Sequence, residues 1–293
     1  MSIWEAFIQG IIQGLTEFLP VSSSGHLALY QYFTGQSGES GALFVLVLHL
    51  GTLVAVFVAF WKTIRELIVE FFSAIPDLFF GRLDIRHPSP NRKFIFLLIV
   101  SLLPLFLTLL FKDPLRAVAE DNDILVEGVC FLITSGMLLS ADKMTRGRKT
   151  AANMSYRAAL TIGMVQAVAP LPGISRSGST LSAGLALGLS QKFAVTFSFI
   201  MGIPAVCAAL LLDIPEIISG GLNTPVSVIF VGLITSMVFG ILAIQMVRWL
   251  VASQKLRWFG YYTLVLGSVT VVIGICEKLL DHPIQKMIVG LLG

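Results

Sequence analysis

Long apolar segments alternate with short polar connections along most of the chain. A helix that crosses the hydrocarbon core of a bilayer needs about 20 predominantly apolar residues. Six segments meet this requirement, at 42–61, 94–111, 124–141, 193–212, 226–247 and 258–276. Pro104 and Pro204 lie inside two of them, and we expect both to be tolerated because neighbouring helices can satisfy the freed carbonyl groups. The pattern therefore predicts six membrane-spanning helices.

Two further apolar stretches, 3–33 and 158–189, are interrupted near their middle by Pro, Ser and Gly. Each half is too short to cross a bilayer, so each stretch predicts a re-entrant hairpin, in which a helix, a polar turn and a second helix dip into the membrane. Non-helical backbone is tolerated at that depth only where protein surrounds it or where it lines a water-filled cavity. We therefore expect both turns to line a cavity.

The composition supports an all-α polytopic membrane protein. Hydrophobic side chains make up 56% of the 293 residues and charged side chains 13%, whereas a soluble domain carries about 25% charged residues. The mean hydropathy is +0.87. The net charge is only +3, which excludes nucleic acid as a partner and leaves membrane lipids. Because no linker divides the chain, we expect residues 1–293 to form one membrane domain.

Basic residues gather in alternate connections, and this sets the orientation because short cytoplasmic loops are rich in Lys and Arg. The connections after the first, third and fifth predicted spans are basic and are placed inside. Their basic residues are Lys62, Arg65, Arg82, Arg86, Arg92, Lys93, Lys143, Arg146, Arg148, Lys149, Arg157, Arg248, Lys255 and Arg257. The connections 112–123 and 213–225 carry more acidic than basic residues and are placed outside. The first hairpin then enters from the outer side and the second from the inner side.

The two hairpins also match each other at a fixed offset of 153 residues. Gly10, Gln13, Ser22, Ser24 and Gly25 coincide with Gly163, Gln166, Ser175, Ser177 and Gly178. The match predicts two repeats, 1–150 and 151–293, each with one hairpin and three spans. An odd number of spans inverts the second repeat. Inverted repeats with paired broken helices predict a polar site where the two breaks meet.

The residues at the two breaks carry the candidate chemistry. The first break reads EFLPVSSSGH and brings a carboxylate, Glu17, three hydroxyl groups and the imidazole of His26 into ten residues of an apolar segment. The second reads PGISRSGST, in which the guanidinium of Arg176 lies among hydroxyl groups. Arginine presents a planar fork that matches phosphate, and amide groups at a helix start add further donors. This pattern favours an oxyanion site.

Together, EFLPVSSSGH and PGISRSGST resemble the two signature motifs of the undecaprenyl-diphosphate phosphatase family of the bacitracin-resistance type. The resemblance covers the whole chain in length, span order and duplication. It implies an enzyme of the bacterial plasma membrane that hydrolyses undecaprenyl diphosphate to undecaprenyl phosphate and inorganic phosphate, recycling the lipid carrier of cell-wall synthesis at a site open to the outer side. It implies catalytic roles for Glu17, Ser23, His26 and Arg176, and substrate binding by Ser22, Ser175, Arg176, Ser177 and Thr180.

The mechanism stays open at this stage. Ser23, activated by His26 or Glu17, is one candidate nucleophile, since His26 follows it by one helical turn. Water activated by Glu17 or His26 is the other. Glu17 is also the expected ligand of a divalent cation, Mg²⁺ or Ca²⁺, because the site offers oxygen ligands and no cysteine cluster. The family's first motif begins with Glu or Gln, and Gln13 here cannot act as a base.

A carrier is the competing functional class. Inverted repeats with broken helices are typical of transporters, so the chain is alternatively a flippase for a polyprenyl phosphate or a transporter of a small anion. The cluster of hydroxyl groups and imidazole favours an enzyme, because catalysis needs such a cluster and a carrier does not. A homodimer is left open, and His49, which lies in the first predicted span outside any motif, is interpreted as a satisfied core histidine.

Overall fold

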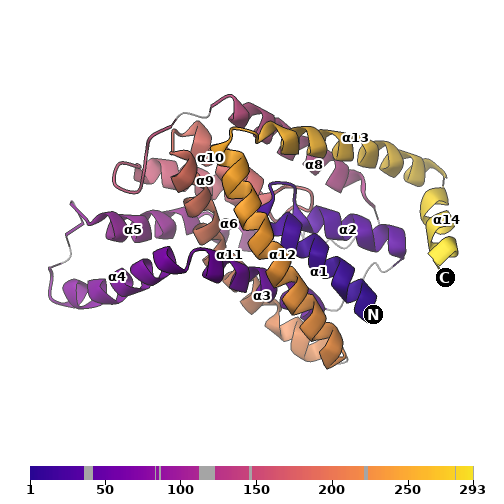
Figure 1. The fold of residues 1–293 in the computed structure, drawn as a ribbon, viewed down its shortest axis with the longest axis horizontal. Coiled ribbons are helices and arrows are strands. Elements are labelled where there is room, and N and C mark those ends of the chain that lie inside the picture. The colour runs from indigo at the N-terminus through magenta and orange to yellow at the C-terminus, as the bar shows by residue number, and fades with distance from the viewer. Residues whose placement is uncertain are drawn as a thin grey trace.

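The computed structural model describes residues 1–35, 42–82, 84–85, 87–111, 123–144, 147–220, 224–280 and 282–292. Figure 1 shows an assembly of helices in which the two termini lie on the same side. The helices are α1 (Ile3–Phe18), α2 (Ser23–Thr34), α3 (Ala42–Ala59), α4 (Trp61–Phe79), α5 (Pro90–Leu102), α6 (Leu105–Thr108), a 3-10 turn (Leu109–Phe111), α8 (Leu125–Asp142), α9 (Tyr156–Gln166), α10 (Arg176–Ala186), α11 (Gln191–Gly220), α12 (Val226–Ala252), α13 (Arg257–Leu280) and α14 (Pro283–Leu292). Within the described ranges the β-pairing is limited to one isolated bridge, between Lys149 and Leu189. The all-helical prediction is confirmed.

Five helices or helix pairs of the described chain are long and apolar enough to cross a membrane. They are Pro90–Thr108, Leu125–Asp142, Gln191–Leu212, Val226–Ala252 and Arg257–Leu280. The remaining predicted span, 42–61, corresponds to α3, which qualifies only together with α4, and the chain bends by 86° between the two. The number of candidate spans is therefore five, or six with the bent pair.

The two prolines inside predicted spans have different outcomes. Pro204 lies within the continuous helix α11. Pro104 falls in the break between α5 and α6, where its ring removes a backbone donor and crowds the preceding turn. The second span is therefore a broken helix rather than a continuous one.

The connection after α3 contains a helix that the hydrophobic pattern did not predict. Ile64 and Leu67 of α4 are buried, and their spacing places them on one helical face. Arg92, near the start of α5, pairs with Glu70 at 2.8 Å and with Asp77 at 2.9 Å. The charged residues of this segment therefore hold α4 against α5 instead of marking a loop. Of the other residues used for orientation, Arg86, Arg146 and most of 112–123 lie outside the described residues.

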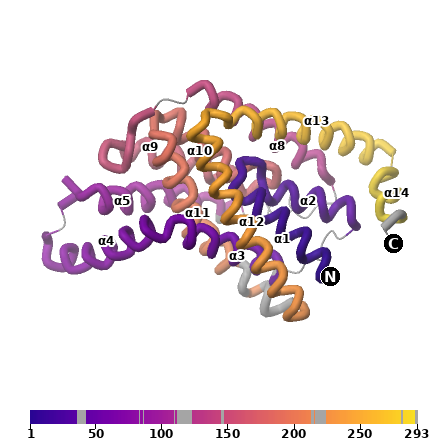
Figure 2. Tube along the Cα trace, viewed as in Figure 1, coloured from indigo at the N-terminus to yellow at the C-terminus, as the bar shows by residue number. Residues whose placement is uncertain are grey.

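The long helices pack pairwise. α8 lies along α13, α12 lies between α1 and α3, and α9 packs on α5; Figure 2 shows the first of these pairs crossing the top of the molecule. Large apolar side chains at a four-residue spacing face outward from α12, at Phe230, Ile234, Val238 and Leu242. A continuous exposed apolar stripe of this kind suits contact with lipid.

The two predicted hairpins are present as α1 with α2 and α9 with α10. Their turns repeat the same local hydrogen bonds at the offset of 153 residues: Ser22 Oγ accepts from the Gly25 amide at 3.3 Å, and Ser175 Oγ accepts from the Gly178 amide at 3.0 Å. Each of these serines caps the helix that follows it. These contacts support a duplication of the hairpins, while the complete inverted repeat and the re-entrant path stay predictions.

Candidate active site

The turn of the first hairpin brings Glu17 and Ser23 together. Glu17 lies in the last turn of α1, and Ser23 is the first residue of α2. Between them, Ser22 has a φ of 71°, a left-handed conformation that is uncommon outside glycine. Its hydroxyl group accepts from the Gly25 amide at the start of α2, and this cap fixes the turn. As a result, Ser23 Oγ donates to Glu17 Oε2 at 2.6 Å.

The second hairpin supplies Arg176 from the opposite side. Ser175 caps α10, so Arg176 is the first residue of that helix. Its Nη2 atom pairs with Glu17 Oε1. A Cβ atom on Gly202 of α11 would lie 1.7 Å from Arg176 Nη1, so the missing side chain at position 202 makes the space that the guanidinium occupies.

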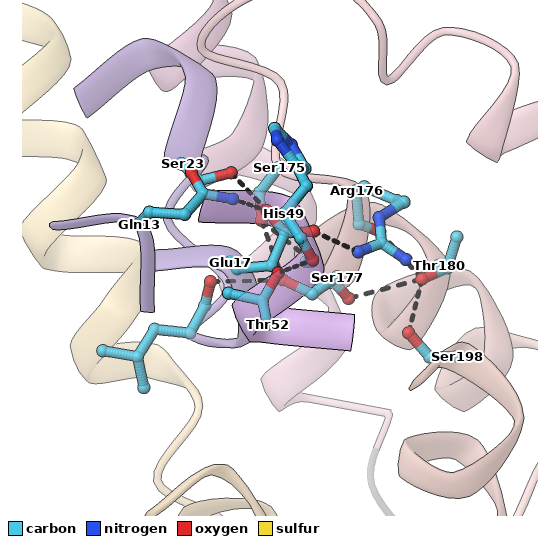
Figure 3. Close-up of polar contacts among 12 residues, drawn as sticks. Gln13, Glu17, Ser23, His49, Thr52, Ser175, Arg176, Ser177, Thr180 and Ser198 are labelled. Carbon is cyan, nitrogen blue, oxygen red and sulfur yellow. Dashed lines mark hydrogen bonds and ion pairs between the residues drawn. The ribbon is translucent and has the colours of Figure 1, made fainter. Parts of the chain in front are cut away.

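The Glu17 carboxylate is thus the meeting point of both hairpins, as Figure 3 shows. It accepts hydrogen bonds from Gln13 Nε2 at 3.0 Å, from Ser23 and from Arg176. Its side chain is 7% exposed. A carboxylate buried to this degree needs such donors, because an unpaired charge there would be very costly.

The turns themselves also interlock directly. The Gly173 amide donates to Ser22 Oγ at 3.1 Å, and Ser177 Oγ donates to the Leu19 carbonyl at 3.1 Å. A Cβ atom on Gly25 would lie 2.9 Å from the Gly173 backbone. Glycine at position 25 therefore lets the two turns approach closely enough for Arg176 to reach Glu17, whereas Gly173 makes room for the Glu127 carbonyl of α8.

A cavity of about 740 Å³ opens beside this cluster. Its polar lining includes Glu17, Ser22, Ser23, Ser24, His49, Gln166, Ser175 and Arg176. Its apolar lining includes Leu102, Leu105, Phe106, Ile174, Pro204, Ala205, Val206, Leu210, Leu211 and Leu212. The expectation that both turns line a cavity is confirmed, and the cavity joins a small polar end to a long apolar wall.

His26 does not lie in this cluster. One ring nitrogen, Nδ1, contacts the Ser22 carbonyl at 2.7 Å, and the other, Nε2, contacts the Tyr262 hydroxyl at 2.7 Å. The ring stacks on Tyr262 of α13. The expected proton-transfer pair of Ser23 and His26 is not formed in this structure, because Ser23 turns back towards α1 whereas His26 packs against α13. A catalytic role for His26 stays a prediction.

The remaining predicted substrate ligands have different positions. Ser22 and Ser175 cap helices and line the cavity. Ser177 joins the two turns, and Thr180 Oγ1 contacts the Arg176 carbonyl at 2.8 Å and the Ser198 hydroxyl at 2.6 Å. Ser177 and Thr180 therefore hold the start of α10 in place, and their direct contact with a substrate stays a prediction.

Two cavity residues were not identified as functional from the sequence. His49 lines the cavity, although its Nδ1 atom contacts the Val45 carbonyl at 2.9 Å, as expected of a satisfied core histidine. Gln166 lines it as well. In the sequence, Gln166 is notable only as the counterpart of Gln13 in the repeat, and this correspondence with a residue beside Glu17 is the one signal for it.

The described residues contain no group of three or more His, Cys, Asp or Glu side chains placed to hold a metal ion. Among the described residues that line the cavity, Glu17 is the one acidic side chain. The amide oxygen of Gln13 is buried without a partner among the described residues, but Gln13 turns its Nε2 atom to Glu17 and is not among the described residues that line the cavity. Glu17 therefore offers one carboxylate to a Mg²⁺ or Ca²⁺ ion, which would take its remaining ligands from water and phosphate, and this cofactor stays a prediction.

Comparison with known proteins gives one consistent result. The family model described as bacitracin resistance protein BacA matches residues 6–269. A protein of Methanosphaera stadtmanae named undecaprenyl-diphosphatase is 38% identical over 280 residues, which cover 94% of this chain and 99% of the relative. Proteins of the same name from Alkaliphilus metalliredigens and Treponema denticola are 35% and 38% identical over 92% and 91% of this chain, covering 98% and 96% of the relatives.

The ion pair gives a prediction that does not depend on turnover. Arg176→Met leaves the buried Glu17 carboxylate without its cation, so we expect a loss of about 2 kcal/mol in the free energy of unfolding, below the 3–5 kcal/mol of a fully buried pair because Arg176 is partly exposed. Adding Glu17→Gln to this variant should restore part of the loss. Denaturant unfolding in detergent micelles, arranged as a double-mutant cycle, measures both effects.

Lys278→Met is the matched control for this cycle, because Lys278 pairs with Asp123 at 3.0 Å but is 68% exposed. This substitution should lower the free energy of unfolding by less than about 1 kcal/mol. If Arg176→Met costs no more than Lys278→Met, the ion pair does not stabilise the junction of the hairpins.

Proposed function

The chain belongs to the family of bacitracin resistance protein BacA, and we propose that it hydrolyses the terminal phosphoanhydride bond of undecaprenyl diphosphate, giving undecaprenyl phosphate and inorganic phosphate. One observation carries the proposal for this site: the carboxylate of Glu17 binds both a serine hydroxyl and an arginine at the polar end of an apolar cavity. A nucleophile, a proton acceptor and a phosphate ligand are thus held together where a lipid can reach them.

Arg176 is the proposed ligand of the terminal phosphate. Its guanidinium is permanently charged and forms paired hydrogen bonds to phosphate oxygens. The negative charge on these oxygens must be stabilised as the bridging bond breaks, and fixed positive groups in a site of low dielectric constant supply this stabilisation. In the structure, Arg176 contacts Glu17. When substrate binds, the guanidinium therefore either leaves the Glu17 carboxylate for the terminal phosphate or binds both anions at once.

Ser23 is the proposed nucleophile. Its hydroxyl already donates to Glu17 Oε2, so the carboxylate is placed to accept the proton as Ser23 Oγ bonds to the terminal phosphorus and the bridging oxygen leaves with undecaprenyl phosphate. Water then releases inorganic phosphate from the serine. The alternative route, in which Glu17 takes a proton from an attacking water molecule, uses the same contacts and stays open.

The lipid chain is proposed to lie along the apolar wall of the cavity. Leu102, Leu105 and Phe106 come from the break between α5 and α6, and Leu210 and Leu211 come from α11. These side chains form an apolar path from the exterior of the bundle to Glu17.

The cavity is proposed to open towards the outer side of the plasma membrane. Its lining comes from the start of α3, the break at Pro104 and residues 204–212 of α11. The opposite ends of these helices carry the basic residues. Lys93, at the start of α5, donates to the Ala152 carbonyl, and Arg248 donates to the carbonyl of Ala59, the last residue of α3. Since basic ends favour the inside, the cavity lies at the outer ends.

A divalent cation, Mg²⁺ or Ca²⁺, is the proposed cofactor. Glu17 would hold it, together with the phosphate oxygens of the substrate. When bound, it would neutralise part of the diphosphate charge. The competing carrier hypothesis needs no proton acceptor bonded to a serine hydroxyl, so the contact between Glu17 and Ser23 favours hydrolysis.

The first prediction here concerns the placement of Arg176. Arg176→Lys keeps the charge and loses the fork, whereas Arg176→Ala loses both, so phosphate release should fall in each and by roughly 100-fold or more in the Ala variant. Gly202→Ala should also lower turnover because its Cβ atom displaces the guanidinium. Gly136→Ala is the control, since a Cβ atom there meets nothing within 4 Å. Wild-type turnover by Arg176→Ala would remove Arg176 from the site.

The second prediction separates metal binding from base catalysis at Glu17. If Glu17 mainly holds a cation, excess Mg²⁺ or Ca²⁺ should restore part of the rate of Glu17→Gln, because an amide oxygen remains a weak ligand. We expect this partial rescue. The measurement is phosphate release against ion concentration for wild type, Glu17→Gln and Ser23→Ala.

Two outcomes of that titration would contradict the assignments. A rate for Glu17→Gln that is unaffected by any ion concentration would exclude the metal role. Full activity in Ser23→Ala would assign the attack to water or to another hydroxyl group of the turn.

The third prediction tests orientation. In a chain without its native cysteines, a cysteine at position 224, in the connection before α12, should react with a membrane-impermeant thiol reagent added outside intact cells. Cysteines at Arg148 and Lys255, both exposed, should react only after the cells are permeabilised. Labelling of position 148 in intact cells would reverse the proposed orientation.

A further inference from the structure

Gln166 is a buried amide without a hydrogen-bond partner in the wall of the cavity. The residue is 1% exposed. Neither its Nε2 atom nor its Oε1 atom has a partner among the described residues. Gln13, at the corresponding position of the first hairpin, differs because its Nε2 atom donates to Glu17. Gln166 is therefore a polar group that the fold buries beside the proposed site and leaves unsatisfied.

Burial of an amide without partners is unfavourable unless a ligand supplies the missing hydrogen bonds. Burying an amide without partners destabilises the folded protein, so unsatisfied buried groups in native structures need a specific explanation. An apolar side chain of similar size would remove the penalty. The cavity that Gln166 lines offers the explanation. Both polar atoms are enclosed in this structure, and a turn of the side chain towards the cavity would let a bound ligand supply an acceptor for the NH₂ group and a donor or cation for the carbonyl oxygen.

The position of Gln166 indicates which part of the ligand it meets. It is the last residue of α9 and follows Gly163 by one turn. A Cβ atom on Gly163 would lie 2.2 Å from the Ser101 carbonyl, so this face of α9 lies directly against α5. The apolar wall of the cavity begins next to it, at Leu102 and Leu105. Gln166 therefore lies on the side of the lipid path, whereas Arg176 is held by Glu17 on α1.

We infer that Gln166 is a substrate-binding residue whose amide donates to the lipid-proximal phosphate, the one that stays on the product. The inference rests on the proposed function and divides the diphosphate between two subsites. Arg176 and Ser23 take the terminal phosphate, which leaves. Gln166 takes the phosphate that remains on the lipid, and it fixes the position of the bridging oxygen between the two.

The test compares two product ligands that occupy different subsites. Inorganic phosphate fills only the terminal subsite, and undecaprenyl phosphate fills only the lipid-proximal subsite and the apolar wall. For Gln166→Met, which keeps the length of the side chain and removes both polar atoms, we expect KM and the inhibition constant of undecaprenyl phosphate to rise by about tenfold or more. The inhibition constant of inorganic phosphate should not change. Arg176→Lys should give the reverse pattern.

Stability distinguishes this role from a structural one. Because the amide of Gln166 makes no hydrogen bond within the described protein, Gln166→Met should unfold at the same temperature as wild type or a higher one. Gln166→Glu, which keeps the shape and brings a carboxylate against phosphate, is the second variant and should weaken undecaprenyl phosphate binding still further. Gln245→Met, at an exposed position of α12, is the matched control and should leave all constants unchanged.

Binding is also measured without turnover, as the rise in unfolding temperature that undecaprenyl phosphate produces. A wild-type protein that binds this lipid but releases no phosphate from undecaprenyl diphosphate would contradict the proposed function and leave the Gln166 subsite testable. An unchanged inhibition constant and an unchanged stabilisation by undecaprenyl phosphate in both Gln166 variants would overturn the inference. Unfolding of both variants in the absence of ligand would also overturn it, since it would make Gln166 a structural residue.

Discussion

The burial of one carboxylate inside an apolar bundle is the constraint on which the site depends. Glu17 is almost fully enclosed, and its charge is tolerable only because Arg176, Ser23 and Gln13 donate to it. Two of these donors come from its own hairpin and the third from the other hairpin. The carboxylate is therefore satisfied only when both hairpins are folded and docked, which links assembly of the two halves of the chain to assembly of the active site.

This constraint explains the glycine and serine content of the two turns. Arg176 reaches Glu17 only if the turns approach within contact distance, and glycine at position 25 allows that approach. The serines at 22 and 175 then satisfy the amide groups that each helix start leaves without a partner. In a membrane, where water cannot replace a missing partner, each of these local contacts is needed for the turn to persist.

Much of this arrangement is predictable from the sequence, and the limits have physical causes. Hydropathy locates the apolar helices, and the breaks at Pro20 and Pro172 locate the hairpins, because these signals are local. The cluster of Glu17, Ser23 and Arg176 follows from the motifs. The position of His26 does not, since its partner Tyr262 lies 236 residues away, on α13.

The same limit applies to elements and residues without a distinctive local signal. The charges of α4 suggest a loop, and only the pairing of Arg92 with Glu70 and Asp77 shows that they face a neighbouring helix. His49 and Gln166 line the cavity through tertiary packing alone. For Gln166, the informative property is the absence of a partner in the described structure, and a sequence cannot show which buried amides are left unsatisfied.

The charge balance of the cavity gives a physical reason for a cation that is independent of the number of protein ligands. Among the described lining residues, Glu17 is the acidic side chain and Arg176 the arginine, and their opposite charges cancel. A terminal phosphate brings about −1.5 to −2 charges at neutral pH. If Arg176 turns to this phosphate, Glu17 loses its counterion. If Arg176 stays on Glu17, the phosphate has no counterion. Either arrangement leaves excess negative charge in an apolar site, and the proposed divalent cation, held by Glu17, would neutralise part of it.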